Sequence, residues 1–310
     1  GLKLVDYLKP RLFQPLGIEN ATWEESPQGI NSGGIGLSAT TEAIARFGQL
    51  YLQKGVWQGR QLLPETWVEA ATSFQIANGE GAESDWTQGY GYQFWRCRHN
   101  AYRGDGVFGQ YCIVMPEQDA VLAITGGVDL FDMQQPLNLV WELLLPAMNA
   151  APLPDEAAAH DSLKQKLSAL NIPAVQGEAL SPTAEVSDRT YKVDANELNI
   201  ETIALDFTES GCIVMLKTAA GEENFPCGYG IWQPGQNTVF NETRLSAPMA
   251  VVASAAWTGH DNFTMVVGLY ETPFFHTVVY HFVGAEMLIE TRVNVSFEAP
   301  KTLLLTAHSV

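Results

Sequence analysis

The first half of the chain alternates between helix-like and strand-like hydrophobic patterns. Apolar residues recur at three- and four-residue spacing in four segments, which predicts amphipathic helices. Three other segments are rich in aromatic and β-branched residues and are bounded by Gly or Pro, which predicts strands. The expected helices cover residues 4–15, 41–54, 64–71 and 132–148, and the expected strands cover residues 89–98, 111–115 and 120–125. This order favours an antiparallel sheet with flanking helices.

The second half has a different pattern. Residues 150–155 are rich in Pro and Ala and indicate a linker, and a helix is expected from about Asp155 to Leu170. From residue 189 onward apolar and polar residues alternate, which predicts an antiparallel β-barrel or sandwich. We therefore expect an α+β protein with a first domain at 1–149, a linker and helix at 150–188, and a β domain at 189–310.

Charge and composition exclude several classes of partner. The net charge of −18, from 17 basic and 35 acidic residues, disfavours nucleic acid and anionic membrane surfaces. No stretch of about 18 uninterrupted apolar residues occurs, so we expect no membrane insertion.

The four cysteines show no metal-ligand spacing, and we expect neither a metal nor a cofactor. Cys97 with Cys112, or Cys212 with Cys227, could form a disulfide. Free buried thiols are favoured over either pairing, and they fit a reducing, cytoplasmic location.

Residues 103–127, RGDGVFGQYCIVMPEQDAVLAITGG, form a glycine-rich turn followed by two apolar strands. This segment resembles the third active-site motif of serine hydrolases of the class C β-lactamase and penicillin-binding-protein superfamily. The fragments DYLKPRLFQPLGIENATW, GGIGLSATTEAIARFGQLYLQKGVWQGRQLLPETWV and GYGYQFW resemble other parts of the same superfamily. The second half resembles the lipocalin-like barrels appended to some of these enzymes. The resemblance implies part of an α/β serine hydrolase domain followed by a barrel.

Members of this superfamily cleave an amide or ester through an acyl-serine intermediate. They use a Ser-x-x-Lys nucleophile motif, a Tyr-x-Asn or Tyr-x-Ser motif, and a third motif, Lys-Thr-Gly or His-x-Gly, on an edge strand. The chain contains neither of the first two motifs. We therefore expect the nucleophile to lie upstream of Gly1 in the whole protein, and this chain alone to be inactive.

The resemblance places the third motif at Gly104, Asp105 and Gly106. Gly106 takes the position of the motif glycine, Asp105 the hydroxyl position and Gly104 the cationic position, and the Val107 N–H becomes the oxyanion donor from this strand. The glycines could instead serve only a tight strand entry.

A Lys or His is missing at the cationic position, which puts recognition of a β-lactam-type carboxylate in doubt. Arg103 or His99 could supply the positive group near the substrate. An ester or peptide-like amide is therefore as good a candidate substrate as a β-lactam.

A second reading belongs to a different class of protein. The chain could be a non-catalytic binding or scaffolding module whose β domain binds a ligand or partner, although side chains fill most small barrels. An apolar face left open by the missing segment could also drive formation of a homodimer.

Overall fold

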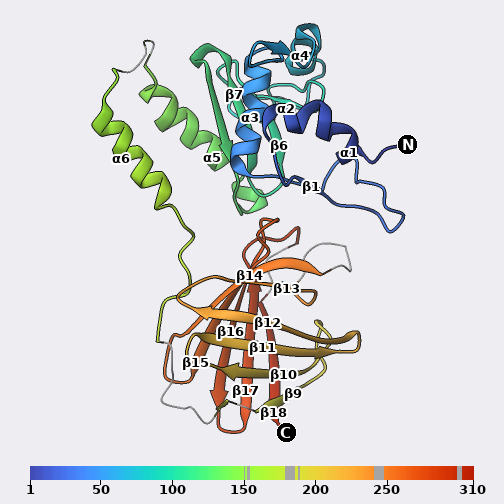
Figure 1. Cartoon of the computed structure of the whole chain (residues 1–310), viewed down its shortest axis with the longest axis vertical. Helices are drawn as coiled ribbons and strands as arrows, with labels where there is room; N and C mark the ends of the chain where they lie inside the picture. The colour runs from blue at the N-terminus through green and yellow to red at the C-terminus, as the bar shows by residue number, and fades with distance from the viewer. Residues whose placement is uncertain (150, 152–153, 179–185, 188, 241–247, 299–301) are drawn as a thin grey trace. The chain divides into compact units, whose positions relative to one another are not determined.

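The structure is a computed structural model, and it describes residues 1–149, 151, 154–178, 186–187, 189–240, 248–298 and 302–310. The chain divides into two compact units, Gly1–Leu153 and Pro154–Val310. The elements of each unit are coloured along the chain in Figure 1. Each unit is described by itself below.

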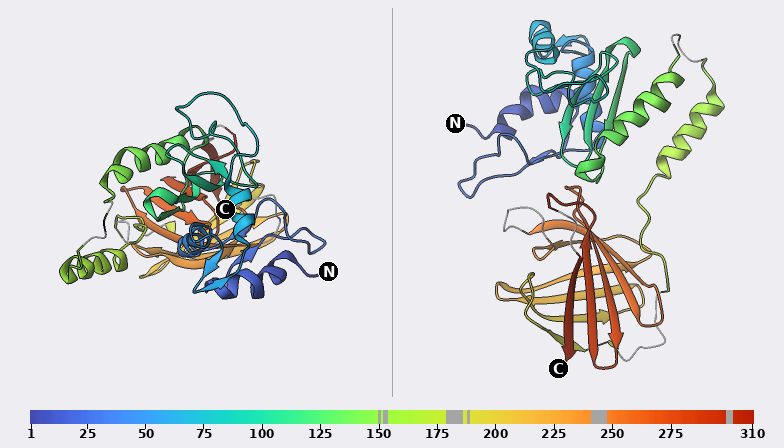
Figure 2. Two further views of the ribbon diagram at one scale, coloured as in Figure 1. Left: turned by 90° about the horizontal axis from the view of Figure 1, so that it is seen from above. Right: turned by 180° about the vertical axis from the view of Figure 1, so that it is seen from behind.

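A four-stranded antiparallel sheet forms the centre of unit 1. Its strand order is β5-β6-β7-β8, and its bounds are β5 (Trp95–Arg96), β6 (Tyr102–Gly106), β7 (Gln110–Met115) and β8 (Ala120–Ile124). Two small hairpins accompany it, formed by β1 (Thr22–Trp23) with β2 (Leu37–Ser38), and by β3 (Val56–Trp57) with β4 (Arg60–Gln61). Helix α3 (Thr41–Leu52) covers one face of the sheet over β7 and β8, and α5 (Gln134–Leu139) covers the other (Figures 1 and 2).

The helices of unit 1 begin and end at the residues that the sequence indicates. The Thr40 hydroxyl accepts a hydrogen bond from the Ala43 N–H and caps α3, and Gly55 follows this helix with φ +83°. Gly17, with φ +65°, ends the first helical segment. That segment comprises α1 (Leu4–Leu8), a π-helical turn (Lys9–Phe13) and α2 (Gln14–Leu16). The others are α4 (Glu65–Thr72) and a run in which α5 continues through Val140–Leu144 and Leu145–Ala147.

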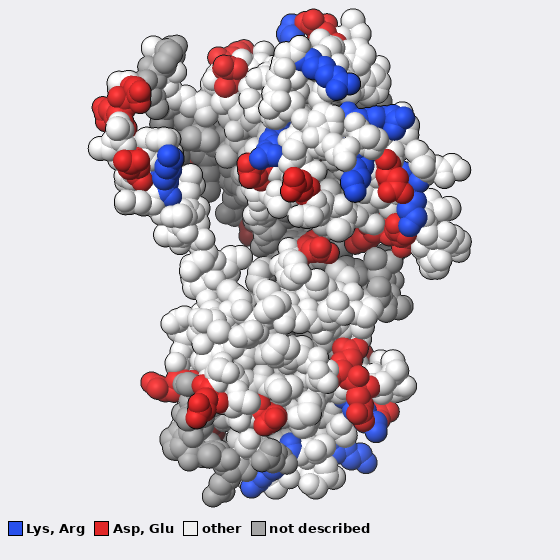
Figure 3. All heavy atoms as spheres, viewed as in Figure 1, with Lys and Arg blue, Asp and Glu red and all other residues white. Residues whose placement is uncertain are grey.

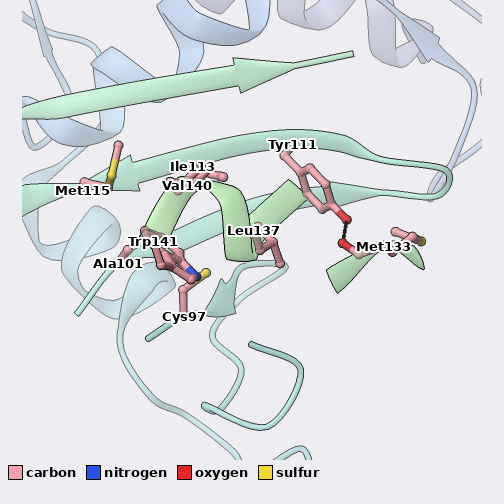
Figure 4. Close-up of a cluster of buried hydrophobic side chains, with 9 residues drawn as sticks. All are labelled: Cys97, Ala101, Tyr111, Ile113, Met115, Met133, Leu137, Val140 and Trp141. Carbon is pink, nitrogen blue, oxygen red and sulfur yellow. Dashed lines mark hydrogen bonds between the residues drawn. The ribbon is translucent and has the colours of Figure 1, made fainter. Parts of the chain in front are cut away.

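Each face of the sheet has its own apolar core. Tyr111, Ile113 and Met115 of β7 alternate toward Leu137 and Trp141 of the α5 segment (Figure 4). The Tyr111 hydroxyl donates to the Met133 carbonyl at 2.6 Å, which is the dashed bond in Figure 4. On the opposite face Val114 packs among aromatic and aliphatic side chains of α3, α4 and β6, which include Tyr51, Val68 and Tyr102. The sheet is therefore held between two packed layers.

Unit 2 contains α6 (Ala157–Ser168) and a ten-stranded sheet that closes on itself. The bounds are β9 (Thr190–Val193), β10 (Ile200–Phe207), β11 (Gly211–Thr218), β12 (Gly221–Tyr229), β13 (Gln233–Asn237), β14 (Met249–Trp257), β15 (Asn262–Gly268), β16 (Phe275–Val283), β17 (Glu286–Val293) and β18 (Thr302–Ser309). Neighbouring strands are antiparallel, and a short parallel pairing of β12 with β14 closes the ring. Closure removes free sheet edges, so the β domain is a barrel and not a sandwich.

Side chains fill the interior of the barrel. Phe225 of β12, Phe263 and Met265 of β15, and Met287 of β17 point inward, and each has a relative exposure of 0%. Inward and outward positions alternate along β16 and β17, as the sequence pattern predicts. The described interior of the barrel is therefore a packed core.

Two local expectations need correction or completion. The strand expected over residues 89–98 is reduced to Trp95–Arg96, because the chain turns through Gly91 and Phe94, whose N–H and carbonyl bond to each other at 2.8 Å. All four cysteines are free and buried, although Cys212 and Cys227 are cross-strand partners on β11 and β12.

The surface and the helices agree with the charge and hydropathy of the chain. On the face in Figure 3, Asp and Glu are scattered over both units with Lys and Arg among them, and no single acidic cluster dominates. Within the described residues, none of the helices is both long and apolar enough to pass through a bilayer.

Candidate active site

The end of β6 is an open sheet edge. In the described part of the chain, β5 pairs only with Tyr102 and Arg103 of β6, so Gly104–Gly106 have a strand partner on the β7 side alone. The chain then turns at Val107, whose side chain is 40% exposed. Backbone groups on such an edge can bond an extended ligand. This is where the sequence places the third motif.

The turn that follows β6 is held tightly. Phe108 has φ +63° and is fully buried, and Gly109 has φ +87°. A phenylalanine in the left-handed region is strained, and such a residue persists only where its surroundings fix it. The Phe108 carbonyl accepts the Val128 N–H at 2.9 Å, which fastens the turn to the segment after β8.

The Gln110 carboxamide provides a second connection between these segments. Its Nε2 donates to the Gly126 carbonyl at 2.6 Å and, at longer distance, to the Phe108 carbonyl at 3.3 Å. Its Oε1 accepts from the Gly126 N–H at 3.3 Å. Gln110 therefore fixes the direction of the backbone next to Val107.

Arg103 and Asp105 form a buried ion pair. They lie two residues apart on β6 and so share one face of the sheet, where Arg103 Nε donates to Asp105 Oδ2 at 2.7 Å. The Arg103 side chain is 0% exposed, and its guanidinium lies 4.5 Å from the ring centroid of Trp86. Burial raises the pKa of Asp105 in spite of the neighbouring cation. The two charges thus pair with each other inside the domain, although Arg103 Nη2 has no hydrogen-bond partner among the described residues.

A buried carboxylate, Asp85, ties three segments to this sheet. It accepts hydrogen bonds from the backbone and guanidinium of Arg98, from Gln134 and from the Trp141 indole, all between 2.8 and 3.1 Å. The Asp85 carbonyl in turn accepts from Arg103 Nη1 at 2.9 Å. Burial alone would raise the pKa of Asp85, but the hydrogen bonds from Arg98, Trp141 and Gln134 together lower it. We call Asp85, Arg98, Gln134 and Trp141 the Asp85 cluster. It is attached to β6 by the hydrogen bond from Arg103 to the Asp85 carbonyl.

The two faces of β6 differ at its open end. Arg103 and Asp105 point toward Trp86 and the Asp85 cluster, so Gly104 and Gly106 face the other way, toward the layer of α3. A Cβ placed on Gly106 would lie 2.9 Å from Gln110 Cβ, which is too close, whereas a Cβ on Gly104 would meet only Cys112 Cβ at 3.7 Å. Space is therefore available beside Gly104.

His99 lies away from this end. It is exposed, occupies the turn between β5 and β6 with φ +56°, and its ring centroid is 5.2 Å from that of Trp141. Gly106 ends β6 at the opposite end of the strand, and a strand of five residues is about 13 Å long. The structure therefore brings Gly104, Asp105, Gly106 and Val107 together and leaves His99 apart.

Two residues that organise the site were missed in the sequence. Gln110 directly follows the Gly-x-Phe-Gly turn, and its position there was the available signal. Asp85 lies in the polar loop before the aromatic run 86–95, and only the fold shows that it is buried.

In comparisons with known proteins, residues 1–127 match the family model described as Beta-lactamase. A 6-aminohexanoate-dimer hydrolase of Paenarthrobacter ureafaciens is 30% identical over 129 residues, which cover 39% of this chain and 33% of that protein.

Two solved structures are each similar to part of the chain. A structure from Bacillus anthracis with the provisional name 6-aminohexanoate-dimer hydrolase is 29% identical, covers 39% of this chain and 32% of its own, and has a TM-score of 0.34. A Schistosoma mansoni fatty acid binding protein in complex with arachidonic acid is 7% identical, covers 41% of this chain and 98% of its own, and has a TM-score of 0.32. The chain spans about a third of the length of the two hydrolase relatives.

Proposed function

Residues 1–127 belong to the β-lactamase-related superfamily of serine hydrolases and penicillin-binding proteins, and on this premise we propose that the chain forms one wall of an acyl-transfer site. The whole protein hydrolyses an amide or ester of a small molecule through an acyl-serine intermediate. The observation that carries the proposal is the open edge Gly104–Gly106, which ends in the rigid turn at Val107. In this proposal the Val107 N–H stabilises the oxyanion of the tetrahedral intermediate.

In this proposal Arg103 and Asp105 hold β6 in position and do not contact the substrate. Arg103 and Asp105 bind each other and lie under Trp86, so they keep β6 in place. Adding further protein to the domain can only bury them more deeply. A role for Arg103 as the group that meets the substrate is therefore replaced by a role in shaping the strand.

The nucleophile comes from a part of the protein outside Gly1–Val310. No Ser-x-x-Lys occurs in the sequence, and an uncovered apolar surface supports the need for a further segment. Beside the outer edge of β8, a groove of about 420 Å³ is lined by Ile124, Pro136, Leu139, Val140, Leu143 and Leu144. Leu139 and Leu143 are 55% and 67% exposed, and β8 has neither a charge nor a proline to protect its edge. A segment of the same domain covers this groove in the proposed enzyme.

The packed barrel bears on the alternative of a binding module. A ligand inside the barrel needs an interior volume of several hundred Å³, whereas the inward side chains of the described strands have almost no exposed surface. This packing supports the hydrolase over a module that binds its ligand within the barrel.

A fluorophosphonate probe tests the proposal directly. The full-length protein is expected to be labelled on one serine, three residues before a lysine and upstream of Gly1, and the chain Gly1–Val310 alone is the matched control that stays unlabelled. Absence of any labelled serine in the full-length protein would contradict the hydrolase and favour the binding module.

A further inference from the structure

The glycine at position 104 is not required by the backbone or by packing. Its φ lies outside the left-handed region, and an added Cβ would make one ordinary contact, with Cys112 Cβ at 3.7 Å. At Gly48 of α3, by contrast, an added Cβ would approach Val121 and Cys112 within 2.7 Å. Gly48 lets α3 lie on β7, whereas Gly104 leaves open space on β6.

This open space adjoins the edge that the proposed substrate uses. A side chain at position 104 would project from the face opposite to Arg103 and Asp105, directly next to Gly106 and the turn at Val107. The acyl group of a bound substrate would lie against the Gly104 backbone at this point.

Neither of the two cations considered for this site, Arg103 and His99, is available to such an acyl group. Arg103 is fully buried and paired with Asp105, and His99 lies in the turn at the other end of the strand. Recognition of a carboxylate takes a charge-assisted hydrogen bond or a nearby positive group, and the chain's net charge of −18 repels anions.

We infer that the site takes an acyl group that is uncharged where it crosses β6, and that Gly104 determines this specificity. The inference rests on the proposed acyl-transfer function. A Cβ fits at position 104, and a lysine there would present a cation to the substrate.

The test compares two four-carbon acyl esters on the full-length protein. These are 4-nitrophenyl butyrate, which is neutral, and mono-4-nitrophenyl succinate, which differs in carrying a carboxylate. We expect kcat/KM for the butyrate to be about tenfold higher or more, which is the value of roughly one charge-assisted hydrogen bond. This ratio is measured on the unaltered protein and does not depend on the folding of a variant.

Substitution at Gly104 gives the second arm. Gly104→Lys is expected to shift the ratio toward the succinate by about tenfold, and Gly104→Met, which has similar length and no charge, is expected not to shift it. If a serine is labelled but the protein prefers the succinate, the inference is overturned and the proposed function stands. Equal shifts in the Lys and Met variants would have the same consequence. No labelled serine and no turnover of either ester would overturn the proposed function, and the inference with it.

Discussion

Gln110 and Gly126 bond to each other in both directions, with the side-chain Nε2 donating at 2.6 Å and Oε1 accepting at 3.3 Å. The Gln110 side chain thus makes the hydrogen bonds to Gly126 that a neighbouring strand would otherwise make. The same carboxamide reaches the Phe108 carbonyl, so the strained turn and the end of β8 move as one piece. The proposed oxyanion donor lies at the first residue of this turn.

Replacing Gln110 should loosen the turn more than the domain. In Gln110→Ala, amide hydrogen exchange of residues 106–109 should rise about 30-fold, because the two hydrogen bonds with Gly126, of about 1 kcal/mol each, are lost. Nuclear magnetic resonance of the chain Gly1–Val310 measures these amides individually.

Gln61 is the matched control for this change. Its Nε2 donates to the Lys54 carbonyl at 2.9 Å and supports the β3–β4 hairpin in the same manner. Gln61→Ala should raise exchange near that hairpin and leave residues 106–109 unchanged. If exchange at residues 106–109 were the same in the Gln110→Ala variant and in the unaltered chain, Gln110 would not hold this turn in position.

Removing the Asp85 carboxylate should destabilise unit 1. Asp85→Ala leaves Arg98 and the Trp141 indole without their acceptor, and the expected loss is about 3–5 kcal/mol in the free energy of unfolding. Glu83→Ala, an exposed change in the same loop, should cost less than about 0.5 kcal/mol. Denaturant unfolding monitored by exchange of β7 amides compares the two.

The Asp85 cluster also predicts acid sensitivity. Because the folded-state pKa of Asp85 is lowered, its stabilising contribution is complete above the unfolded value of about 4 and is lost as pH falls through the lower folded value. The difference in stability between the unaltered chain and Asp85→Ala should therefore shrink below about pH 4. A difference that stays constant down to pH 2 would show that the carboxylate's charge does not contribute.

His276 should give unit 2 a pH dependence in a different range. Burial lowers the pKa of His276 to about 4, below the ordinary value of about 6.5. The unfolded chain gains a proton below pH 6.5 before the folded chain does, so stability should fall between about pH 6.5 and 4, by up to about 3 kcal/mol. It should be independent of this group above pH 7.

Two histidines on β16 allow a paired test. His276→Gln should flatten the pH dependence of exchange in β15–β17, because glutamine does not titrate in this range. His281, whose ring faces outward to Asn262 at 2.8 Å, serves as the control for replacing a histidine of β16 with glutamine. Identical slopes in both variants would contradict the assignment to His276.

Gly48 and Gly104 should respond differently to the same added methyl group. Gly48→Ala brings Cβ within 2.7 Å of Val121 and Cys112 side-chain atoms, and overpacking of this kind costs about 1–3 kcal/mol, partly offset by the helix propensity of alanine. Gly104→Ala has an ordinary contact of 3.7 Å and should change stability by less than about 1 kcal/mol. Thermal unfolding of both variants decides whether α3 lies as closely on β7 as described.

Local features of the fold could be predicted from the sequence because short-range chemistry sets them. The cap at Thr40, the end of the first helix at Gly17 and the alternation along β17 depend on neighbours within a few residues. The short β5 was not predicted, because a hydrogen bond between Gly91 and Phe94 overrides the strand propensity of the aromatic run.

The site was harder to predict because it depends on distant contacts. Asp105, Gly106 and Val107 follow one another in the chain, so their proximity to one another was visible. The burial of Arg103 was not, since Trp86 and Asp85 reach it from a loop that reads as polar and exposed. His99 is close to Arg103 in sequence, but the β5–β6 hairpin places it at the end of β6 that is remote from Gly106.

The packed barrel has a consequence for its response to hydrostatic pressure. Pressure unfolds proteins chiefly by eliminating the empty volume enclosed in the folded state. The side chains of Phe225, Phe263, Met265 and Met287 leave little such volume between the described strands. Unit 2 should therefore be stiff and poorly compressible, and it should keep its shape at pressures that collapse a hollow barrel of the same size.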